Sequence, residues 1–437
     1  MSGGPPGRWL FAAALSILAA GAAQAADTHW EVSGEIAAFY TDNVYFDKSR
    51  NSSSTGTSPN DSPGIYATAD IALMSKTPRG ALEVDYRPAY NYYTQQTAAN
   101  NLEHFLHADW KTGLSPKTTF ELDELASYTP ESTNFQGRGV DAAFTAGPRA
   151  SQLLSRTKLA LEVQASPRWL LTGDYTYRVL NNGSPVTPDS SGAAPVDTIL
   201  FDEEWHEVRF GANRSISPAS SLGGRLIYTE QRFEENLFGP PTTKTRRAGA
   251  ELTYGYIPTK GLSLTLDAGG YGVREQVMQG GGENVNGSDF ILRVRLDRTY
   301  LHGTLAVGIE HGFGSFGGLT TTVGTGASQA VVPVGSSNRT TLYGSYAYNL
   351  TRRSDLTLAG NATRQKTIDG ATTLTTLGAG ATYGFRLAEW GGLRVSYDYA
   401  RQTSDGQALN ANEFSRNTVR LGFFFAKPLG MSTRHAA

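Results

Sequence analysis

The clearest folding signal lies in residues 157–179, TKLALEVQASPRWLLTGDYTYRV, where apolar and polar side chains alternate on both sides of a short turn at Ser166-Pro167-Arg168. Successive side chains of an extended strand point to opposite faces. One face is apolar and aromatic, with Leu159, Leu161, Val163, Trp169, Leu171, Tyr175, Tyr177 and Val179. The other face is polar, with Lys158, Glu162, Gln164, Thr172, Asp174, Thr176 and Arg178. The stretch therefore predicts a β-hairpin with one apolar and one charged face.

This hairpin pattern recurs along the chain, with a tight turn at one end and a longer polar loop at the other. Comparable tight turns lie near 78–80, 115–117, 217–219, 258–261, 297–299, 352–354 and 389–391. The longer loops fall near 41–63, 128–151, 180–199, 231–243, 274–287, 313–337 and 401–415. We expect about 18 antiparallel strands, since each hairpin takes roughly 40 to 50 residues.

The pattern favours a membrane-spanning barrel over a soluble sheet protein. Alternation alone fits both classes, because a soluble sandwich also has one apolar face. Long strands, short turns that alternate with long loops, and clustered aromatic residues favour the barrel. The predicted aromatic belts are formed by Tyr254, Tyr256, Tyr346, Tyr348, Tyr383 and Phe385 at the turn end, and by Tyr175, Tyr177, Tyr397 and Tyr399 at the loop end. The predicted fold is thus an all-β, up-and-down transmembrane barrel with short periplasmic turns and long extracellular loops.

The N-terminus has the features of a secretory signal peptide. Arg8 is followed by an apolar run from Trp9 to Ala20 and then by Ala23-Gln24-Ala25, a small-residue cleavage pattern. We expect cleavage near Ala25, so that residues 1–25 are the signal peptide and residues 26–437 form a single barrel domain. The last strand is predicted at about 418–425, where Val419, Leu421, Phe423 and Phe425 alternate, followed by a polar tail at 426–437. These features predict export to the outer membrane of a Gram-negative bacterium.

Composition excludes several functional classes. The 437 residues contain no cysteine, so disulfide scaffolds, thiolate metal sites and cysteine nucleophiles are absent. The formal net charge of −2 provides no basic surface for a nucleic-acid partner. The stretch 312–317, GFGSFG, matches a dinucleotide-binding pattern but opens no predicted helix. His104 and His107 are three residues apart on a strand and face opposite sides, which excludes a metal pair. We therefore predict no catalytic residue, no cofactor and no metal site.

The predicted lumen is lined by charges of both signs. A barrel of about 18 strands has a backbone diameter of roughly 35 Å, too wide for side chains to fill. Loops near 41–63, 128–151 and 313–337 are candidates to fold inward. The alternation predicts these channel-lining residues: Glu83, Asp85, Arg87, Asp109, Lys111, Glu162, Asp174, Arg178, Glu207, Arg209, Arg247, Glu251, Arg293, Arg295, Arg394 and Asp398. Such a wall suits hydrated polar solutes. The alternative is that these charges form structural ion pairs between strands.

The stretch 39–45, FYTDNVY, resembles the opening of an outer-membrane porin-like family of β-barrels, some of which are associated with exopolysaccharide export. The resemblance implies a passive or partner-gated conduit. Asp42 and Asn43 are also ordinary turn residues at a strand end. The expected partners are outer-membrane lipid and the barrel assembly machinery, and periplasmic export partners if polysaccharide is the cargo.

Three functions follow as hypotheses. The first is a porin-like channel for passive passage of small polar solutes. The second is an exopolysaccharide secretion conduit, for which Phe39, Tyr66, Phe105, Tyr343 and Phe424 are the lumen aromatic residues that would stack on sugars. The third is a scaffold barrel that holds a partner protein. The sequence leaves the solute and the oligomeric state open.

Overall fold

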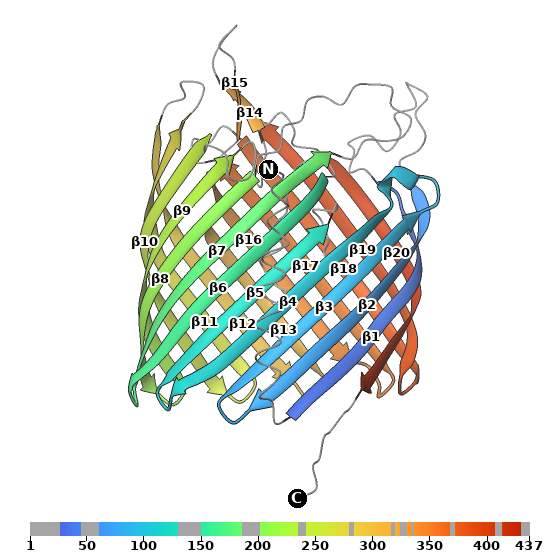
Figure 1. Cartoon of the computed structure of the whole chain (residues 1–437), viewed down its shortest axis with the longest axis horizontal. Coiled ribbons are helices and arrows are strands. Elements are labelled where there is room, and N and C mark those ends of the chain that lie inside the picture. Colours follow the sequence, from blue (N-terminus) through green and yellow to red (C-terminus); the bar gives the residue numbers. More distant parts are fainter. Residues whose placement is uncertain are drawn as a thin grey trace, which may run out of the picture.

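The protein folds into a closed barrel of antiparallel strands (Figure 1). The computed structural model describes residues 27–44, 61–129, 150–185, 202–234, 242–278, 284–315, 320–323, 330–333, 336–367, 372–406 and 413–429. The barrel strands are β1 (Asp27–Thr41), β2 (Ser62–Thr77), β3 (Gly80–Tyr93), β4 (Asn101–Ser115), β5 (Thr118–Thr129), β6 (Ala150–Ser166), β7 (Trp169–Pro185), β8 (Asp202–Ser217), β9 (Ser220–Glu234), β10 (Thr243–Thr259), β11 (Leu262–Val277), β12 (Val285–Tyr300), β13 (Gly303–Ser315), β16 (Ser336–Asn349), β17 (Ser354–Thr367), β18 (Thr372–Ala388), β19 (Gly391–Gly406) and β20 (Phe414–Leu429). These are 18 strands in one sheet, as the sequence predicts.

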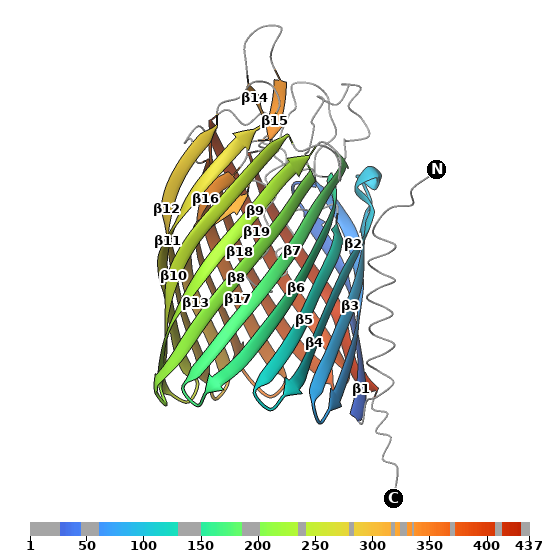
Figure 2. The same ribbon diagram turned by 60° about the vertical axis from the view of Figure 1, so that its left-hand side comes forward.

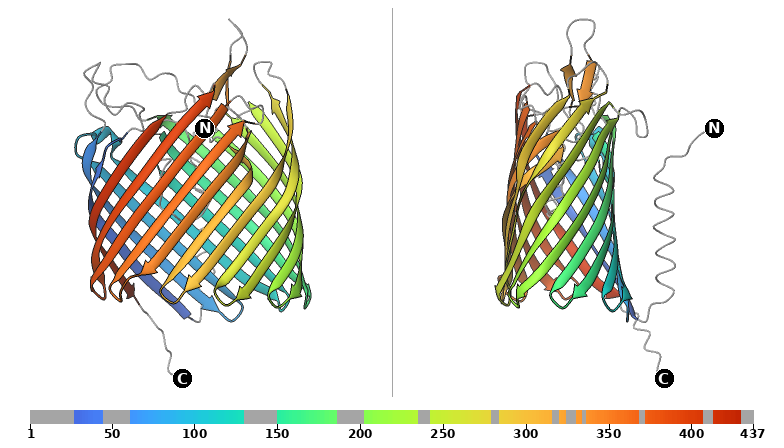
Figure 3. Two further views of the ribbon diagram at one scale, coloured as in Figure 1. Left: turned by 180° about the vertical axis from the view of Figure 1, so that it is seen from behind. Right: turned by 90° about the vertical axis from the view of Figure 1, so that its left-hand side faces the viewer.

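The sheet closes because β1 pairs with both β2 and β20. Across the closing seam, Ala38 is in register with Leu421 and Thr41 with Thr418. Tight turns join the strands at one end, here called the turn rim, and most longer connections lie at the other end, the loop rim (Figure 2). The barrel is broad in one view and narrow when turned by 90°, so its cross-section is flattened (Figures 1 and 3).

The outer face is apolar because alternate residues of every hairpin are hydrophobic. Phe210 on β8 is in register with Leu226 on β9, and both side chains are 64% exposed. Ala250 on β10 continues this row. Such exposure of large apolar groups is unfavourable in water and favourable in hydrocarbon, so this face is suited to lipid.

A tyrosine belt borders the apolar face at the turn rim, where the sequence predicts it. Tyr254 and Tyr256 stack with ring centroids 6.4 Å apart near the turn rim, and Tyr346 and Tyr348 stack at 5.9 Å there. Tyr397, predicted at the loop end, is exposed but lies six residues from the turn-rim end of β19 and nine from its loop-rim end. No helix of the described residues is long and apolar enough to cross a membrane.

Several boundaries differ from the sequence-based expectations. The turn predicted at 297–299 is wrong: β12 continues to Tyr300 and the turn is formed by Leu301 and His302. The strand continues because Arg298 stacks over the Tyr300 ring at 4.7 Å and stays in register with Leu305 on β13. The last strand, β20, also extends beyond the predicted 418–425 at both ends, so that 426–429 belong to the strand.

Strands β7, β9, β11 and β19 continue into stretches predicted as long loops. Their polar ends lack the apolar alternation by which a strand is recognised, but they still pair between strands; Asn181, for example, donates to Asp202 at 2.8 Å. Part of the predicted 313–337 loop forms a separate two-stranded ribbon, β14 (Thr320–Val323) with β15 (Ala330–Pro333), beyond the loop rim (Figure 1). The predicted signal peptide, the greater parts of the 41–63 and 128–151 loops, and residues 430–437 of the predicted tail lie outside the described residues.

Candidate functional site

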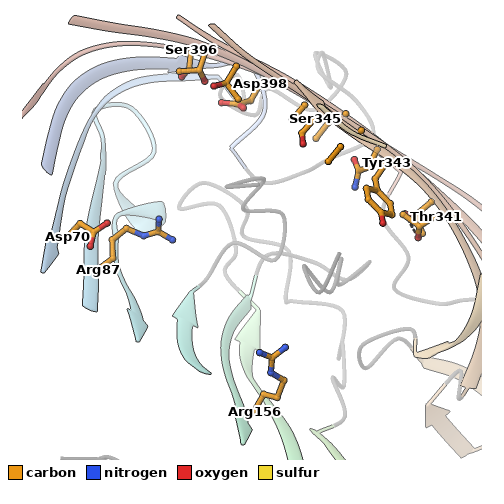
Figure 4. Close-up of a pocket in the computed structure, with 18 of the residues that line it drawn as sticks. Asp70, Arg87, Arg156, Thr341, Tyr343, Ser345, Ser396 and Asp398 are labelled. Carbon is orange, nitrogen blue, oxygen red and sulfur yellow. Dashed lines mark hydrogen bonds between the residues drawn. The ribbon is translucent and has the colours of Figure 1, made fainter. Parts of the chain in front are cut away.

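The inner face of the barrel encloses a cavity of about 1330 Å³, which is the candidate site (Figure 4). Most of the barrel strands contribute side chains to its lining. The opposite sides of this cavity differ in chemistry. Strands β5 to β12 line the cavity mainly with arginines and carboxylates. Strands β16 to β18 line it mainly with hydroxyl, amide and glycine residues, together with the charged residues Arg339, Asp355 and Arg386. We call them the charged wall and the neutral wall.

The first part of the charged wall lies on β4, β5 and β6. Asp123 accepts a bond from Arg156 at 2.8 Å and lies 2.9 Å from His107 Nε2. Glu121 is within 3.3 Å of Lys111 and 3.5 Å of Lys158. Each carboxylate therefore holds two basic groups from neighbouring strands, as the ion-pair alternative for these charges predicts.

The second part lies on β8 to β12 and is more buried. The carboxylate of Glu251 has no exposed surface and pairs with Arg225 and, at 3.1 Å, with Arg293. Glu207 pairs with Arg209 and, at 2.8 Å, with Arg247. Arg209, Arg225 and Arg293 are partly exposed and form the water-facing layer of this wall, whereas Arg247 is as buried as the Glu207 carboxylate that it binds.

The neutral wall presents uncharged hydrogen-bonding groups to the cavity. Its lining includes Thr341, Ser345, Thr357, Asn361, Thr363, Gln365, Gly380 and Thr382. Thr341 and Thr363 share a hydrogen bond of 3.0 Å between their hydroxyl groups. Figure 4 shows Arg156 on the far side of the cavity from Thr341, Tyr343 and Ser345. A solute in the cavity therefore faces many paired charges on one side and mainly neutral polar groups on the other.

An aromatic cluster crosses the flattened lumen. Trp205 on β8 and Phe313 on β13 have ring centroids 5.5 Å apart, although four strands separate β8 from β13 in the sheet. Tyr271 meets Phe313 edge-on at 6.1 Å, and Arg247 lies 5.0 Å above the Phe313 ring. Arg178 lies 5.4 Å above Trp205. These contacts narrow the lumen, and sequence reasoning missed them because the contact depends on the cross-section.

Guanidinium groups cover most of the lumen rings that the sequence offers for sugar stacking. Arg420 lies 4.9 Å above Tyr66, Arg394 lies 4.8 Å above Phe424, and Arg87 lies 5.0 Å above Phe105. Phe39 is buried edge-on against Tyr93 at 5.2 Å, whereas Tyr343 borders the cavity. These cation–π contacts stabilise the arginines and occupy ring faces that a sugar would need.

The structure places nine of the predicted channel-lining residues on the cavity: Arg87, Arg178, Glu207, Arg209, Arg247, Arg293, Arg295, Arg394 and Asp398. Glu251 lies behind the arginines that it binds. The Lys111 ammonium group lies 3.4 Å from the Asp109 carboxylate and 3.3 Å from the carboxylate of Glu121, which lines the cavity. The remaining four predicted residues, Glu83, Asp85, Asp174 and Glu162, are not among the residues that line the cavity. Their register partners on the neighbouring strands are Asp109, His107, Arg209 and Thr119, respectively.

Other cavity residues were not predicted, including Arg156, Lys158, Arg225 and Arg420. Arg156 and Lys158 lie an even number of positions from Glu162 on β6, so all three are on the same face of the strand. The alternation that predicted Glu162 could therefore have predicted Arg156 and Lys158. His104 and His107 face opposite sides, as predicted: His104 bonds Tyr86 at 2.8 Å, whereas His107 bonds Asp123 on the charged wall. The described part of the chain holds no group of three or more acidic or histidine residues suited to a metal ion.

The Asp42-Asn43 pair ties the barrel seam at the loop rim. The Asp42 carboxylate accepts bonds from the Asn417 backbone N–H at 2.7 Å and from its side-chain amide at 2.6 Å. The Asn43 side chain donates to the Ser415 carbonyl at 3.1 Å. These residues join the end of β1 to β20, and their role here is structural.

No family model and no curated protein matches the sequence. Several solved structures align with most of this chain at low sequence identity. Acinetobacter baumannii OccAB4 has 11% identity and a TM-score of 0.44, over 93% of this chain and 99% of that chain. Pseudomonas aeruginosa OpdO has 11% identity and a TM-score of 0.44, over 92% and 98%. A BenF-like porin from Pseudomonas fluorescens Pf-5 has 12% identity and a TM-score of 0.44, over 92% and 99%. The strand pairing itself shows that the chain is an 18-stranded antiparallel barrel.

Proposed function

We propose that the protein is an outer-membrane channel for passive passage of small polar solutes. The observation that carries this proposal is the contrast between the two faces of the closed sheet. Its outside exposes large apolar side chains, and its inside surrounds a cavity lined with charged and hydroxyl groups. In lipid, a strand protein must close on itself to pair its backbone groups, and this sheet does so.

The dimensions of the outer face support a bilayer location. From Trp169 at the turn rim to Tyr177, eight residues at about 3.3 Å each and a tilt of about 40° give roughly 20 Å. The apolar band of an outer-membrane barrel is ~25 Å tall. We assign the turn rim to the periplasm and the loop rim to the exterior, which is the usual orientation of such barrels.

The cavity lining supports passage of hydrated solutes of either charge. Arginines dominate the water-facing layer of the charged wall, but Glu207, Glu251 and Asp123 balance them at close range. Strong ion selectivity needs a ring of one sign, and paired charges reduce the net field. We expect weak selectivity and a preference for small polar molecules that exchange hydrogen bonds with the neutral wall.

The described lumen does not favour the exopolysaccharide conduit. Tyr66 and Phe424 have ring faces covered by Arg420 and Arg394, so these rings do not form an open stacking surface. We infer that the chain is not an enzyme. We also propose that the signal peptide 1–25 is removed and that the barrel assembly machinery inserts the mature chain.

Single-channel recording in a planar bilayer tests this function. The full chain is purified in detergent, and its folded state is verified by a shift in gel mobility on heating. Stepwise conductance that is insensitive to periplasmic extract is the expected result, with cation and anion permeabilities within a few-fold of each other. A folded sample that never conducts would overturn the open-channel proposal.

A further inference from the structure

A belt of charged side chains lies on the outer face of β8 to β11, directly above the apolar rows. His206, Glu230, Arg246 and Arg274 are in register on four neighbouring strands. One step nearer the loop rim, Glu204, Arg232 and Lys244 form a second row. We call these seven residues the outer basic patch. It does not line the cavity, so the channel function does not account for it.

Strand alternation shows that the patch faces outward. Tyr228 is 45% exposed on the outer face of β9. Glu230 and Arg232 are two and four residues further along the strand, so they lie on the same face. Gln231, which lies between them, is buried on the inner face. On β10 the Arg246 side chain is 50% exposed, whereas its neighbour Arg247 points into the lumen and pairs with Glu207.

The patch begins where the apolar band ends. Arg246 and Tyr256 lie on the same strand, ten positions apart, and Tyr256 belongs to the belt at the turn rim. At about 3.3 Å per residue and a tilt of about 40°, this separation is about 25 Å along the membrane normal, which is the height of the apolar band. The row just below the patch, Val208, Tyr228 and Ala248, is uncharged. The basic groups therefore lie at the level of lipid headgroups.

The seven residues of the patch carry more positive than negative charge, and Glu234, two residues beyond Arg232 on the same face of β9, adds one further carboxylate beside them. Glu230 binds three cations at once, with Arg232 at 2.7 Å, Lys244 at 2.8 Å and Arg246 at 3.1 Å. Glu204 accepts a hydrogen bond from the Tyr177 hydroxyl at 3.1 Å and lies 3.4 Å from His206 and 3.5 Å from Arg232. Two carboxylates thus balance four basic side chains.

Several donors of the patch remain available to an external anion. Arg246 uses its Nε atom for Glu230 and keeps its two terminal nitrogens. Arg274 is exposed, in register with Arg246, and forms no ion pair with any residue that the structure describes. Two guanidinium groups on adjacent strands are about 5 Å apart at the backbone, a spacing at which both can bind one phosphate or two neighbouring phosphates.

We propose that the outer basic patch binds the phosphate groups of lipid headgroups in the leaflet at the loop rim. Charge complementarity selects an anionic partner, and continuity with the apolar rows below selects a lipid over a soluble anion, because acyl chains would lie on Leu226 and Tyr228. Arginine binds phosphate in a bidentate manner and is weakly hydrated, which suits a site at this depth. The patch is local: on β3 and β4, the outer residues near the loop rim are Tyr90, Tyr92 and Leu102.

The test measures binding of a bisphosphorylated glucosamine-based glycolipid to the detergent-purified full chain by native mass spectrometry. The variants are Arg274→Gln, which breaks no ion pair of the described residues, and the double variant Arg246→Gln with Arg274→Gln. The control is Arg401→Gln, which removes an exposed outward arginine of β19 that is in register with uncharged Leu377 and Ser415. All samples are first verified as folded by heat-dependent gel mobility.

We expect the double variant to bind the glycolipid about tenfold more weakly, Arg274→Gln to show a smaller loss, and Arg401→Gln to bind as the parent does. The dephosphorylated glycolipid should bind parent and variants alike. Equal losses in the double variant and Arg401→Gln would show general electrostatic attraction and overturn the site. Equal affinity of the parent for inorganic phosphate and the glycolipid would show a free-anion site and overturn the lipid assignment.

Discussion

Replacing Glu251 by glutamine tests whether the charged wall depends on its buried carboxylates. Glutamine keeps the size of the side chain and removes its charge. Arg225 and Arg293 would then share one remaining carboxylate, Asp267, at 3.8 and 3.5 Å. Since Glu251 has no exposed side-chain surface, water does not replace the lost charge at that position.

The expected loss follows from the burial of the three groups. Removing one partner of a fully buried ion pair costs about 3 to 5 kcal/mol, because the other charge is left without compensation. Here the two arginine side chains are 26% and 29% exposed to the lumen, and Asp267 stays in place. We therefore expect the free energy of unfolding to fall by about 2 to 3 kcal/mol for Glu251→Gln.

The assay is urea unfolding of the protein in phosphocholine vesicles, followed by tryptophan fluorescence. The matched control is Asp297→Asn on the same wall. Asp297 pairs at 2.7 Å with Arg295, but its side chain is 37% exposed and that of Arg295 is 55% exposed. An exposed pair contributes at most about 1 kcal/mol, so the control should lose less than that.

Both variants remove one negative charge from the lumen, so net charge cannot explain a difference in stability between them. Both should shift the reversal potential in a salt gradient toward anions. Equal losses of unfolding free energy in the two variants would refute the reasoning, because burial would then have no influence. An unchanged Glu251→Gln midpoint would refute it as well.

Three further predictions concern the seam, the aromatic cluster and the outer basic patch. Asp42→Ala should lower the free energy of unfolding by about 1 to 2 kcal/mol by removing both bonds to Asn417, and should speed amide exchange at the ends of β1 and β20; unchanged exchange there would contradict the seam role. Trp205→Ala should raise single-channel conductance, because it removes the contact with Phe313 across the lumen, and conductance equal to that of the parent would count against a constriction. Glu230→Gln should lower the free energy of unfolding by about 1 kcal/mol, because Arg232, Lys244 and Arg246 lose the carboxylate that they share, and an unchanged free energy of unfolding would argue against this role.

The barrel could be predicted from the sequence because a lipid-facing strand must alternate strictly. Leu226 and Tyr228 face lipid, so each has a strong physical reason to be apolar. The polar residues Arg225 and Thr229 on either side of them face the lumen, whereas Ile227 packs with Tyr271 on the inner face. The same rule fails where both faces are polar. Asp297 and Arg298 resemble a turn for this reason, and the polar ends of β7 and β19 resemble loops, although their backbones stay paired.

The sequence also predicts which residues lie on the inner face, but it does not predict which of them form ion pairs with each other. Glu251 and Arg293 lie on β10 and β12, with β11 between them, so neither spacing nor adjacency in the sequence relates them. Their contact depends on the register of three strands and on long side chains that reach across the middle one. The Trp205 and Phe313 contact depends further on the flattening of the barrel, which no local pattern encodes.

The arrangement of the charged wall explains how a lumen rich in arginine can stay open. Guanidinium groups without a nearby partner would extend into the cavity toward distant carboxylates. Here Asp123, Glu207 and Glu251 each bind arginines that belong to the same wall. Rings of Tyr66 and Phe424 hold two more arginines against the wall. Because β6 and β17 are nine strands apart in an 18-stranded ring, the neutral wall lies opposite, and it lines the cavity with few charged groups that could attract them. The pairing that stabilises the wall is thus the same pairing that keeps its arginines out of the path of a solute.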